Sequence, residues 1–214
     1  AGALDVMGQY YSVASSSHAF YNYGGLVYTG NDEKALFDNM WQKCYAVIAC
    51  CNTIIEKCDE NKAGLSPVWR GSIKGEALAL RAMLHFDMLR LFGPLTSELD
   101  KESIPYQTNS DQTVTPLLSG SEVVGLILDD LKNAVGLLKD TDPYFVEEEF
   151  SDTDLNYRRF RMNYFAAKGL MARVQLWGGD KEKAAATAKE VIAEGQAEGA
   201  EFFPFVTNSE ATSS

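Results

Sequence analysis

A segment near the start of the chain is rich in tyrosine and asparagine, with glycine and serine around them. It contains Tyr21, Asn22, Tyr23, Tyr28 and Asn31. A tyrosine ring offers a flat apolar face with a hydroxyl at its edge, and a sugar ring has one apolar C–H face and a rim of hydroxyl groups. Tyrosines flanked by asparagine therefore suit a sugar, and these five residues form the candidate glycan-binding site. The alternative interpretation, which the residue types alone favour, is that the tyrosines cover the ends of helices.

Catalytic patterns are missing from the rest of the sequence. Of the two histidines, His18 and His85, the second lies within a predicted long helix, where a structural hydrogen-bonding role is favoured. The adjacent carboxylates Asp129 and Asp130 point to different sides of a helix, so they do not form the opposed pair of a glycosidase. No serine occupies a nucleophile elbow, and no glycine-rich phosphate loop follows a strand. We therefore expect neither enzyme activity nor a cofactor.

A calcium-like pattern at Asp152, Asp154 and Asn156 is incomplete. Tyr157 stands where the loop needs glycine, and Asn163 stands where it needs a bidentate acid. A solvated loop is favoured over a metal site, and we expect no metal.

The four cysteines are also expected to be free, because three of them recur every seven residues on a predicted helix. Neighbours at that spacing lie about 10 Å apart along the axis, whereas a disulfide needs Cα atoms within about 7 Å. The set also lacks the paired spacing of a zinc site. We interpret these residues as small buried hydrophobes: Cys44, Cys50, Cys51 and Cys58.

Composition and charge narrow the possible partners. The chain has 214 residues, 46% hydrophobic and 23% charged, with a net charge of -11 and a pI of about 4.6. Such an acidic chain lacks the basic face that phosphate binding requires, so nucleic acid is not an expected partner. No apolar run is long enough to span a bilayer, and no signal-peptide pattern is present.

Hydrophobic periodicity predicts helices that would position the aromatic segment. The first 32 residues are expected to form an aromatic and polar loop region, with at most a short helix over Leu4–Val13. A short strand is expected near Ile104–Tyr106, and a tail is expected over 196–214. The predicted helices are 33–60, 67–92, 122–138, 161–177 and 181–194.

The helix that begins at Pro67 is the central one, because apolar residues line two of its faces and it must be sandwiched. Its buried guanidinium, Arg81, needs a carboxylate partner. Gly93 and Pro94 should end the helix, with the glycine as a left-handed cap. We expect Ser121 to cap the helix that follows.

Small residues indicate how the last two helices pair. Ala167 and Ala172 on one, and Ala184 and Ala188 on the other, stand where two helices approach closely. Such a pair is typical of a tetratricopeptide-type hairpin. We therefore predict an all-α fold of stacked antiparallel helix pairs with long irregular loops. It is expected as one helical domain over 1–214, with the repeats at 33–195.

Several motifs in order along the chain match a known family. On the predicted helix 33–60 they are Trp41, Tyr45, Ile48 and Asn52. On the central helix they are Gly75-Glu76-Ala77, Arg81-Ala82, Phe86 and Leu91-Phe92-Gly93. Further on they are Ile104-Pro105, Ile127-x-Asp129-Asp130-Leu131, Asn163-Tyr164, Ala166-Ala167, Gly169-Leu170, Ala172-Arg173-Val174 and Gly179-Asp180. With these motifs, the chain resembles the SusD/RagB family of cell-surface nutrient-binding lipoproteins.

The resemblance implies a helical, tetratricopeptide-like scaffold on the surface of the cell outer membrane. It implies binding of an extracellular glycan, or in some members peptides, and delivery to a TonB-dependent transporter of the SusC type, without catalysis. A protein- or peptide-interaction scaffold in the same uptake complex is the alternative. Family members are more than twice as long, so this chain resembles their N-terminal portion. The family's lipid-bearing cysteine, its expected membrane anchor, is absent from this chain.

Overall fold

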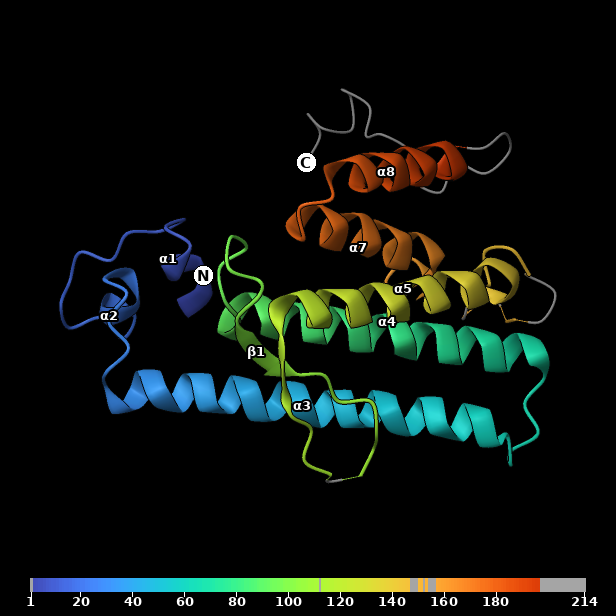
Figure 1. Ribbon diagram of the computed structural model, residues 1–214, viewed down its shortest axis with the longest axis horizontal. Coiled ribbons are helices and arrows are strands. Elements are labelled where there is room, and N and C mark those ends of the chain that lie inside the picture. Colours follow the sequence, from blue (N-terminus) through green and yellow to red (C-terminus); the bar gives the residue numbers. More distant parts are fainter. Residues whose placement is uncertain (1, 112, 147–149, 152, 154–156, 197–214) are drawn as a thin grey trace. The chain divides into compact units, whose positions relative to one another are not determined.

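The computed structural model describes residues 2–111, 113–146, 150–151, 153 and 157–196, and helices dominate it (Figure 1). The predicted all-α fold is thereby confirmed. The chain divides into two compact units, Ala1–Val47 and Ile48–Ser214, and helix α3 (Asn31–Glu60) belongs to both. The prediction of one helical domain over 1–214 stays a prediction.

The first unit is built around a small hydrophobic core. Helix α1 (Ala3–Met7) and the single-turn helix α2 (Tyr21–Gly24) precede α3. The predicted helix over Leu4–Val13 is wrong in its end, because α1 stops at Gly8 and Gln9 follows with a positive φ of 60°. The core and the hydrophobic residues packed on it are Ala3, Val6, Tyr23, Met7, Val13, Phe20, Tyr28, Leu36 and Phe37.

The second unit is a stack of antiparallel helices, as predicted. Its long helices, after the end of α3, are α4 (Pro67–Phe92), α5 (Gly120–Thr141), α7 (Tyr164–Trp177) and α8 (Lys181–Gly195). Helix α4 packs on α5, α5 on α7, and α7 on α8, which Figure 1 shows as successive layers. Ion pairs tie the end of α3 to the start of α4 (Lys74 with Asp59) and α7 to the end of α8 (Lys168 with Glu194).

Helix α4 begins and ends where the sequence indicates, but its end has a different geometry. Ser66 Oγ accepts a hydrogen bond from Trp69 N at 3.3 Å, and Pro67 occupies the first turn. The expected left-handed cap at Gly93 is wrong, since its φ is -85°. A Cβ at Gly93 would lie 2.5 Å from the Leu89 carbonyl oxygen. Glycine is therefore needed there for space and not for a positive φ.

Two glycines on α4 allow a close approach to α5. A Cβ on Gly71 would lie 2.5 Å from Thr141 Cγ2, and one on Gly75 would lie 2.7 Å from Leu138 Cγ. These contacts pair the start of α4 with the end of α5. The two helices are therefore packed too closely for side chains at these positions.

A two-stranded antiparallel sheet interrupts the connection between α4 and α5. Strand β1 (Glu102–Pro105) largely confirms the predicted strand, and β2 (Leu117–Ser119) was not predicted. Glu102 pairs with Ser119 and Pro105 with Leu117, with an irregularity between them. The pairing buries Ile104 and Tyr106, and so brings Tyr106 against the helices.

The starts of the later helices correct two predictions. Ser119, not Ser121, caps α5, because Ser119 and Glu122 form a reciprocal capping box. Helix α7 begins at Tyr164 and not at 161, because Asn163 Oδ1 caps it by accepting from Ala166 N at 2.9 Å. The predicted helix over 181–194 is confirmed as α8.

Some burial predictions are wrong. All four cysteines are free, and Cys51 and Cys58 are buried as predicted, but Cys44 is only half-buried and Cys50 is exposed. On α8, Ala184 is buried whereas Ala188 is exposed, and Thr187 fills that side of the contact with α7.

Two predicted features concern residues that the structure does not describe. The tail 196–214, apart from Gln196, and the calcium-like residues Asp152, Asp154 and Asn156 lie outside the described residues. Among the described residues, no helix combines the length and the hydrophobicity that crossing a bilayer requires.

Candidate functional site

The predicted glycan-binding residues all lie in the first unit, on or beside a chain of aromatic contacts. The Tyr23 ring meets Phe20 at 6.0 Å and Phe37 at 6.4 Å between centroids, and Phe37 meets Tyr28 at 5.3 Å. All three pairs meet edge to face, which is a favourable geometry for aromatic rings. This aromatic cluster (Phe20, Tyr23, Tyr28, Phe37) fixes helix α2 relative to the start of α3 inside the unit.

The five residues do not all face solvent. Tyr21 is 43% exposed and Asn31 is exposed at the start of α3. Tyr23 is only 4% exposed, and Tyr28 is half-buried against Phe37. Asn22 is exposed, and its Nδ2 donates to Glu33 Oε1 at 2.8 Å. The structure thus places a ring and two amide side chains at the surface, whereas the other two tyrosines are buried or half-buried.

Two neighbouring tyrosines, Tyr10 and Tyr11, add to the exposed aromatic surface of this unit. Their side chains are 79% and 57% exposed. The preceding residue, Gln9, donates from Nε2 to the Gly24 carbonyl oxygen at 3.3 Å, which ties this segment to the end of α2. The candidate site taken from the sequence includes neither of them, although two adjacent tyrosines were a usable signal for an exposed aromatic surface.

The charges of this unit are mainly acidic. No lysine or arginine precedes Lys34. Glu33 is buried and its carboxylate accepts from Asn22. Burial, followed by the charges of Glu33 and Asp32, raises the pKa of the Tyr23 hydroxyl. The Tyr23 hydroxyl therefore remains protonated at neutral pH.

In the second unit, the polar residues that resemble catalytic groups form a closed structural network. Arg81 donates to both carboxylate oxygens of Asp130, each at 2.7 Å, and to Asn52 Oδ1 at 2.8 Å. The Tyr106 hydroxyl donates to Asp130 Oδ2 at 2.6 Å. The predicted carboxylate partner of Arg81 is confirmed, and Asp130 is committed to it while Asp129 is exposed.

His85 belongs to the same network and is neutral. Gln107 N donates to its Nε2 at 3.0 Å, so Nδ1 carries the proton and faces the Arg81 carbonyl oxygen at 3.0 Å. Its ring stacks on Tyr106 with centroids 3.9 Å apart. Burial lowers the pKa of His85 to about 4. These contacts make His85 a hydrogen-bonding residue of the core, as the sequence indicates.

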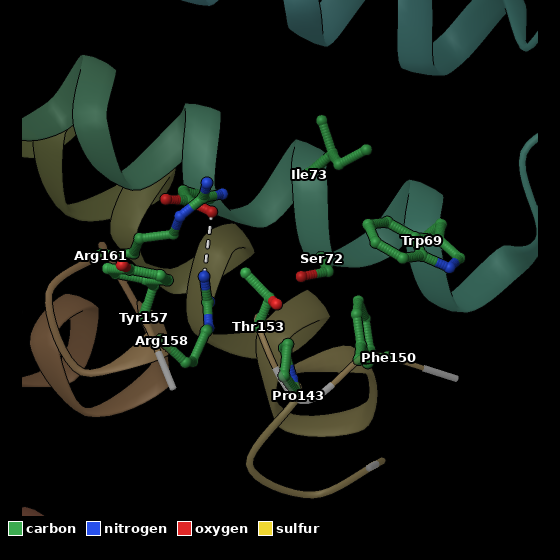
Figure 2. A pocket seen from close by; sticks show the side chains of 10 residues that line it. Trp69, Ser72, Ile73, Pro143, Phe150, Thr153, Tyr157, Arg158 and Arg161 are labelled. Atoms are coloured by element: carbon green, nitrogen blue, oxygen red, sulfur yellow. Dashed lines mark hydrogen bonds and ion pairs between the residues drawn. The ribbon is translucent and has the colours of Figure 1, made fainter. Parts of the chain in front are cut away.

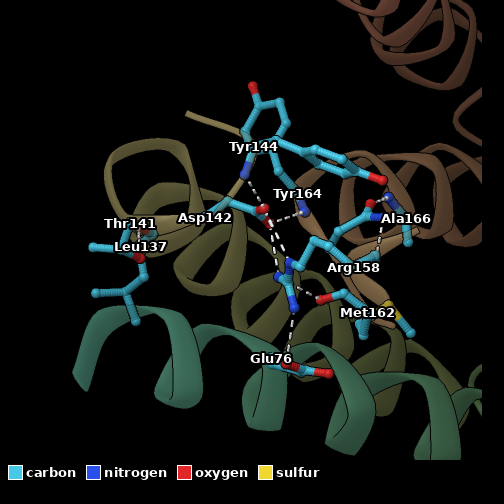
Figure 3. A network of polar contacts seen from close by, with 10 residues as sticks. Glu76, Leu137, Thr141, Asp142, Tyr144, Arg158, Met162, Tyr164 and Ala166 are labelled. Carbon is cyan, nitrogen blue, oxygen red and sulfur yellow. Dashed lines mark hydrogen bonds and ion pairs between the residues drawn. The ribbon is translucent and has the colours of Figure 1, made fainter. Parts of the chain in front are cut away.

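A second buried arginine holds together three elements of the same unit (Figure 3). Arg158 donates from Nη2 and Nε to the carboxylate of Asp142 at 2.7 and 3.0 Å, and from Nη1 to Glu76 Oε2 at 2.9 Å. Asp142 also accepts from Tyr164 N at 2.8 Å. Asp142 directly follows α5, Tyr164 begins α7 and Glu76 lies on α4. The sequence analysis missed this network, because no periodic pattern links its members.

A cavity of about 120 Å³ opens beside this second network (Figure 2). Figure 2 shows Trp69 and Phe150 on one side, and Tyr157 and Arg161 on the other. Its lining is Trp69, Ser72, Ile73, Glu76, Pro143, Phe150, Thr153, Tyr157, Arg158 and Arg161. Aromatic and hydrogen-bonding side chains thus share one small space. Within the described ranges, no group of three or more histidines, cysteines or acids is gathered that could hold a metal ion.

Comparison with known proteins gives a consistent result. A family model named SusD-like_3, described as "Starch-binding associating with outer membrane", matches residues 5–176. SusD-like protein P38 of Formosa agariphila is 34% identical over 96 residues, covering 44% of this chain and 17% of that protein. A SusD-like protein of Bacteroides ovatus is 30% identical over 146 residues, covering 66% of this chain and 23% of that protein.

The fold is similar to that of a solved structure. A protein from Bacteroides vulgatus ATCC 8482, named as a candidate sugar-binding protein, superposes with a TM-score of 0.65 at 25% identity. The match covers 86% of this chain and 38% of that protein. The chain therefore spans well under half the length of each of these three proteins.

Proposed function

The chain belongs to the SusD-like family, and on that premise we propose that it binds an extracellular glycan at the cell outer membrane and leaves it chemically unchanged. The proposal includes delivery of the glycan to a TonB-dependent transporter of the SusC type. The family model's description as starch-binding and outer-membrane-associating supports the ligand class and the location. The name of the similar Bacteroides vulgatus structure supports the ligand class as well.

The observation that carries the proposal is the 43% exposed ring of Tyr21 on helix α2, a helix that the aromatic cluster fixes against the start of α3. An exposed ring on a rigid base offers a sugar a stacking surface at low entropic cost. In the proposed site Tyr21 stacks on the sugar, while Asn22 and Asn31 hydrogen-bond its hydroxyl groups. Tyr23 and Tyr28 hold the site from below.

Retention on polysaccharides in native gels tests this function. The 214-residue chain is run through gels that contain starch, a neutral β-glucan or a uronate polysaccharide. We expect retardation by at least one of them, and Tyr21→Ala should weaken it about five- to tenfold, the equivalent of one aromatic contact.

The matched control is Phe160→Ala, because Phe160 is an exposed aromatic residue of the other unit, 75% exposed. This variant should be retarded like the wild type. Absence of retardation by every polysaccharide would refute glycan binding by this chain. Equal retardation of wild type and Tyr21→Ala would remove the proposed site.

A second candidate function is a scaffold that binds protein or peptide in the same uptake complex, and the stacked helices support it. Leu176 on α7 and Ile192 on α8 are 57% and 59% exposed, and exposed apolar side chains on helical repeats suit a protein partner. Capture of a SusC-type transporter by the chain, lost in a Leu176→Glu, Ile192→Glu variant and unaffected by Tyr21→Ala, would support the scaffold. No capture by the wild type would count against it.

A further inference from the structure

The cavity beside Arg158 has aromatic side chains on two sides. Trp69, in the first turns of α4, meets Phe150 with ring centroids 4.5 Å apart. On the opposite side Tyr157 is 61% exposed, so its ring is largely uncovered. The cavity therefore offers aromatic surface at both ends.

The floor of the cavity carries polar groups that are held in place. Glu76 has a side chain 19% exposed, and its Oε2 accepts from Arg158 Nη1 at 2.9 Å. Arg158 is itself fixed by two hydrogen bonds to the fully buried Asp142. The Glu76 carboxylate is thus immobilised at the cavity without being an uncompensated charge.

Further donors complete the lining. The Arg161 side chain reaches the cavity from the exposed segment before α7, and no ion pair within the described ranges involves it. The hydroxyls of Ser72, which is buried, and Thr153, which is exposed, line the space between Glu76 and the aromatic rings. Carboxylate, guanidinium and hydroxyl groups together can donate to and accept from the hydroxyls of one small ligand.

The volume of the cavity limits the ligand to a small molecule. At about 120 Å³ it is well below the roughly 300 Å³ at which pockets for larger organic ligands begin. A single ring with an apolar face and a rim of hydroxyls matches its chemistry, and its size leaves room for no more than about one such ring.

We propose that this cavity binds one sugar ring, which rests on Tyr157 and hydrogen-bonds to Glu76 and Arg161. The inference depends on the proposed function for the ligand class, because the ring would be an end or branch residue of the bound glycan. It adds a sugar contact in the second unit, made by residues separate from the tyrosines of the first.

Trp69 provides a reporter at the cavity. The chain has three tryptophans, at positions 41, 69 and 177, so a Trp41→Phe, Trp177→Phe variant leaves Trp69 as the only indole. Its fluorescence is titrated with glucose, galactose, N-acetylglucosamine and glucuronate, each to about 10 mM, a range suited to weak single-ring binding. We expect a saturable change with at least one of them.

Variants at the cavity test the assignment in the same tryptophan background. Tyr157→Ala and Arg161→Gln should each weaken the response at least fivefold. The matched controls are Phe160→Ala and Arg159→Gln, which alter an exposed cation–π pair outside this cavity, with the guanidinium carbon 5.0 Å from the ring centroid. The controls should titrate like the parent variant.

The possible results separate this inference from the proposed function. No saturable response to any of the four sugars, or equal responses in parent and cavity variants, would overturn the inference. Retardation by a polysaccharide in the native gels would in that case leave the proposed function standing. A response to glucuronate that acetate reproduces, with none to the neutral sugars, would mean a carboxylate site and would also overturn the single-sugar assignment.

Discussion

Arg81 on α4 and Asp130 on α5 form a bidentate ion pair, with both N–O distances at 2.7 Å and both side chains more than nine-tenths buried. Asn52, from the end of α3, accepts a further hydrogen bond from Arg81. Asn52 Nδ2 donates in turn to the carbonyl oxygens of Gln107 and Asn109. One guanidinium therefore joins three helices and the connection that carries β1.

Loss of the Asp130 carboxylate should lower the free energy of unfolding substantially. Asp130→Ala leaves Arg81 buried without its anion, and we expect the free energy of unfolding to fall by about 3–5 kcal/mol. The adjacent Asp129→Ala is the control, since Asp129 is exposed, and it should change stability by no more than about 0.5 kcal/mol. Urea denaturation measures both. A loss of less than about 1 kcal/mol in Asp130→Ala would contradict the structural role of the pair.

His85 should make the protein less stable in mild acid. Its pKa is lowered from 6.5 to about 4 on folding, mainly by burial, so the unfolded chain binds the proton more readily between these values. Stability contributed by neutral His85 is full above pH 6.5 and is lost as the pH falls towards 4. The loss from pH 7 to pH 5 should be about 2 kcal/mol.

Denaturation at both pH values tests this, with His85→Gln and His18→Gln as variants. His85→Gln should lack this part of the pH dependence, whereas His18→Gln should retain it, because His18 is exposed. Identical pH dependence in wild type and His85→Gln would show that His85 is not the titrating group.

A methyl group at Gly75 should separate α4 from α5. Its Cβ would lie 2.7 Å from Leu138 Cγ and 3.3 Å from the Ala134 carbonyl oxygen. Overpacking costs about 1–3 kcal/mol, which should exceed the gain of up to about 1 kcal/mol that alanine brings to a helix. Gly125→Ala, where nothing lies within 4 Å, should instead stabilise. Thermal denaturation measures the two shifts, and equal signs would contradict the close approach.

Tyr23 and Tyr21 should respond differently to truncation. Tyr23→Ala removes a buried ring from the aromatic cluster, with an expected loss of about 3–5 kcal/mol in the first unit. Tyr21→Ala removes an exposed ring and should stay within about 0.5 kcal/mol. Amide hydrogen exchange over residues 3–47 measures both. Unchanged exchange in Tyr23→Ala would mean that the cluster does not hold the unit together.

The helices of the second unit were predictable because their signals are local. Apolar periodicity predicts their existence, and Pro67 with its fixed φ marks the start of α4. The cap at Asn163 is equally local but was missed, so the predicted start of α7 was three residues early. Helix α2 was not predicted because four residues carry no period, and β2 was not predicted because it pairs with residues of β1 that lie 12 to 17 positions earlier in the sequence. An acid partner for Arg81 was predictable from the cost of a buried charge.

The geometry of the candidate sites depends on contacts that sequence spacing does not encode. Tyrosine suits both a core and a surface, so the sequence could not separate buried Tyr23 from exposed Tyr21. The Glu76–Arg158 contact joins residues 82 positions apart. Only the folded chain shows that this ion pair forms the floor of a cavity.

The ion pair between Asp142 and Arg158 gives the loop between them a fixed base. The segment that begins after Asp142 ends at Arg158, which binds the Asp142 carboxylate, and the backbone of Tyr164 at the start of α7 binds the same carboxylate. We therefore expect changes in the sequence or the length of that segment to leave the register of α5 and α7 unchanged. The helical scaffold and the segment between Asp142 and Arg158 could in this way vary independently of each other.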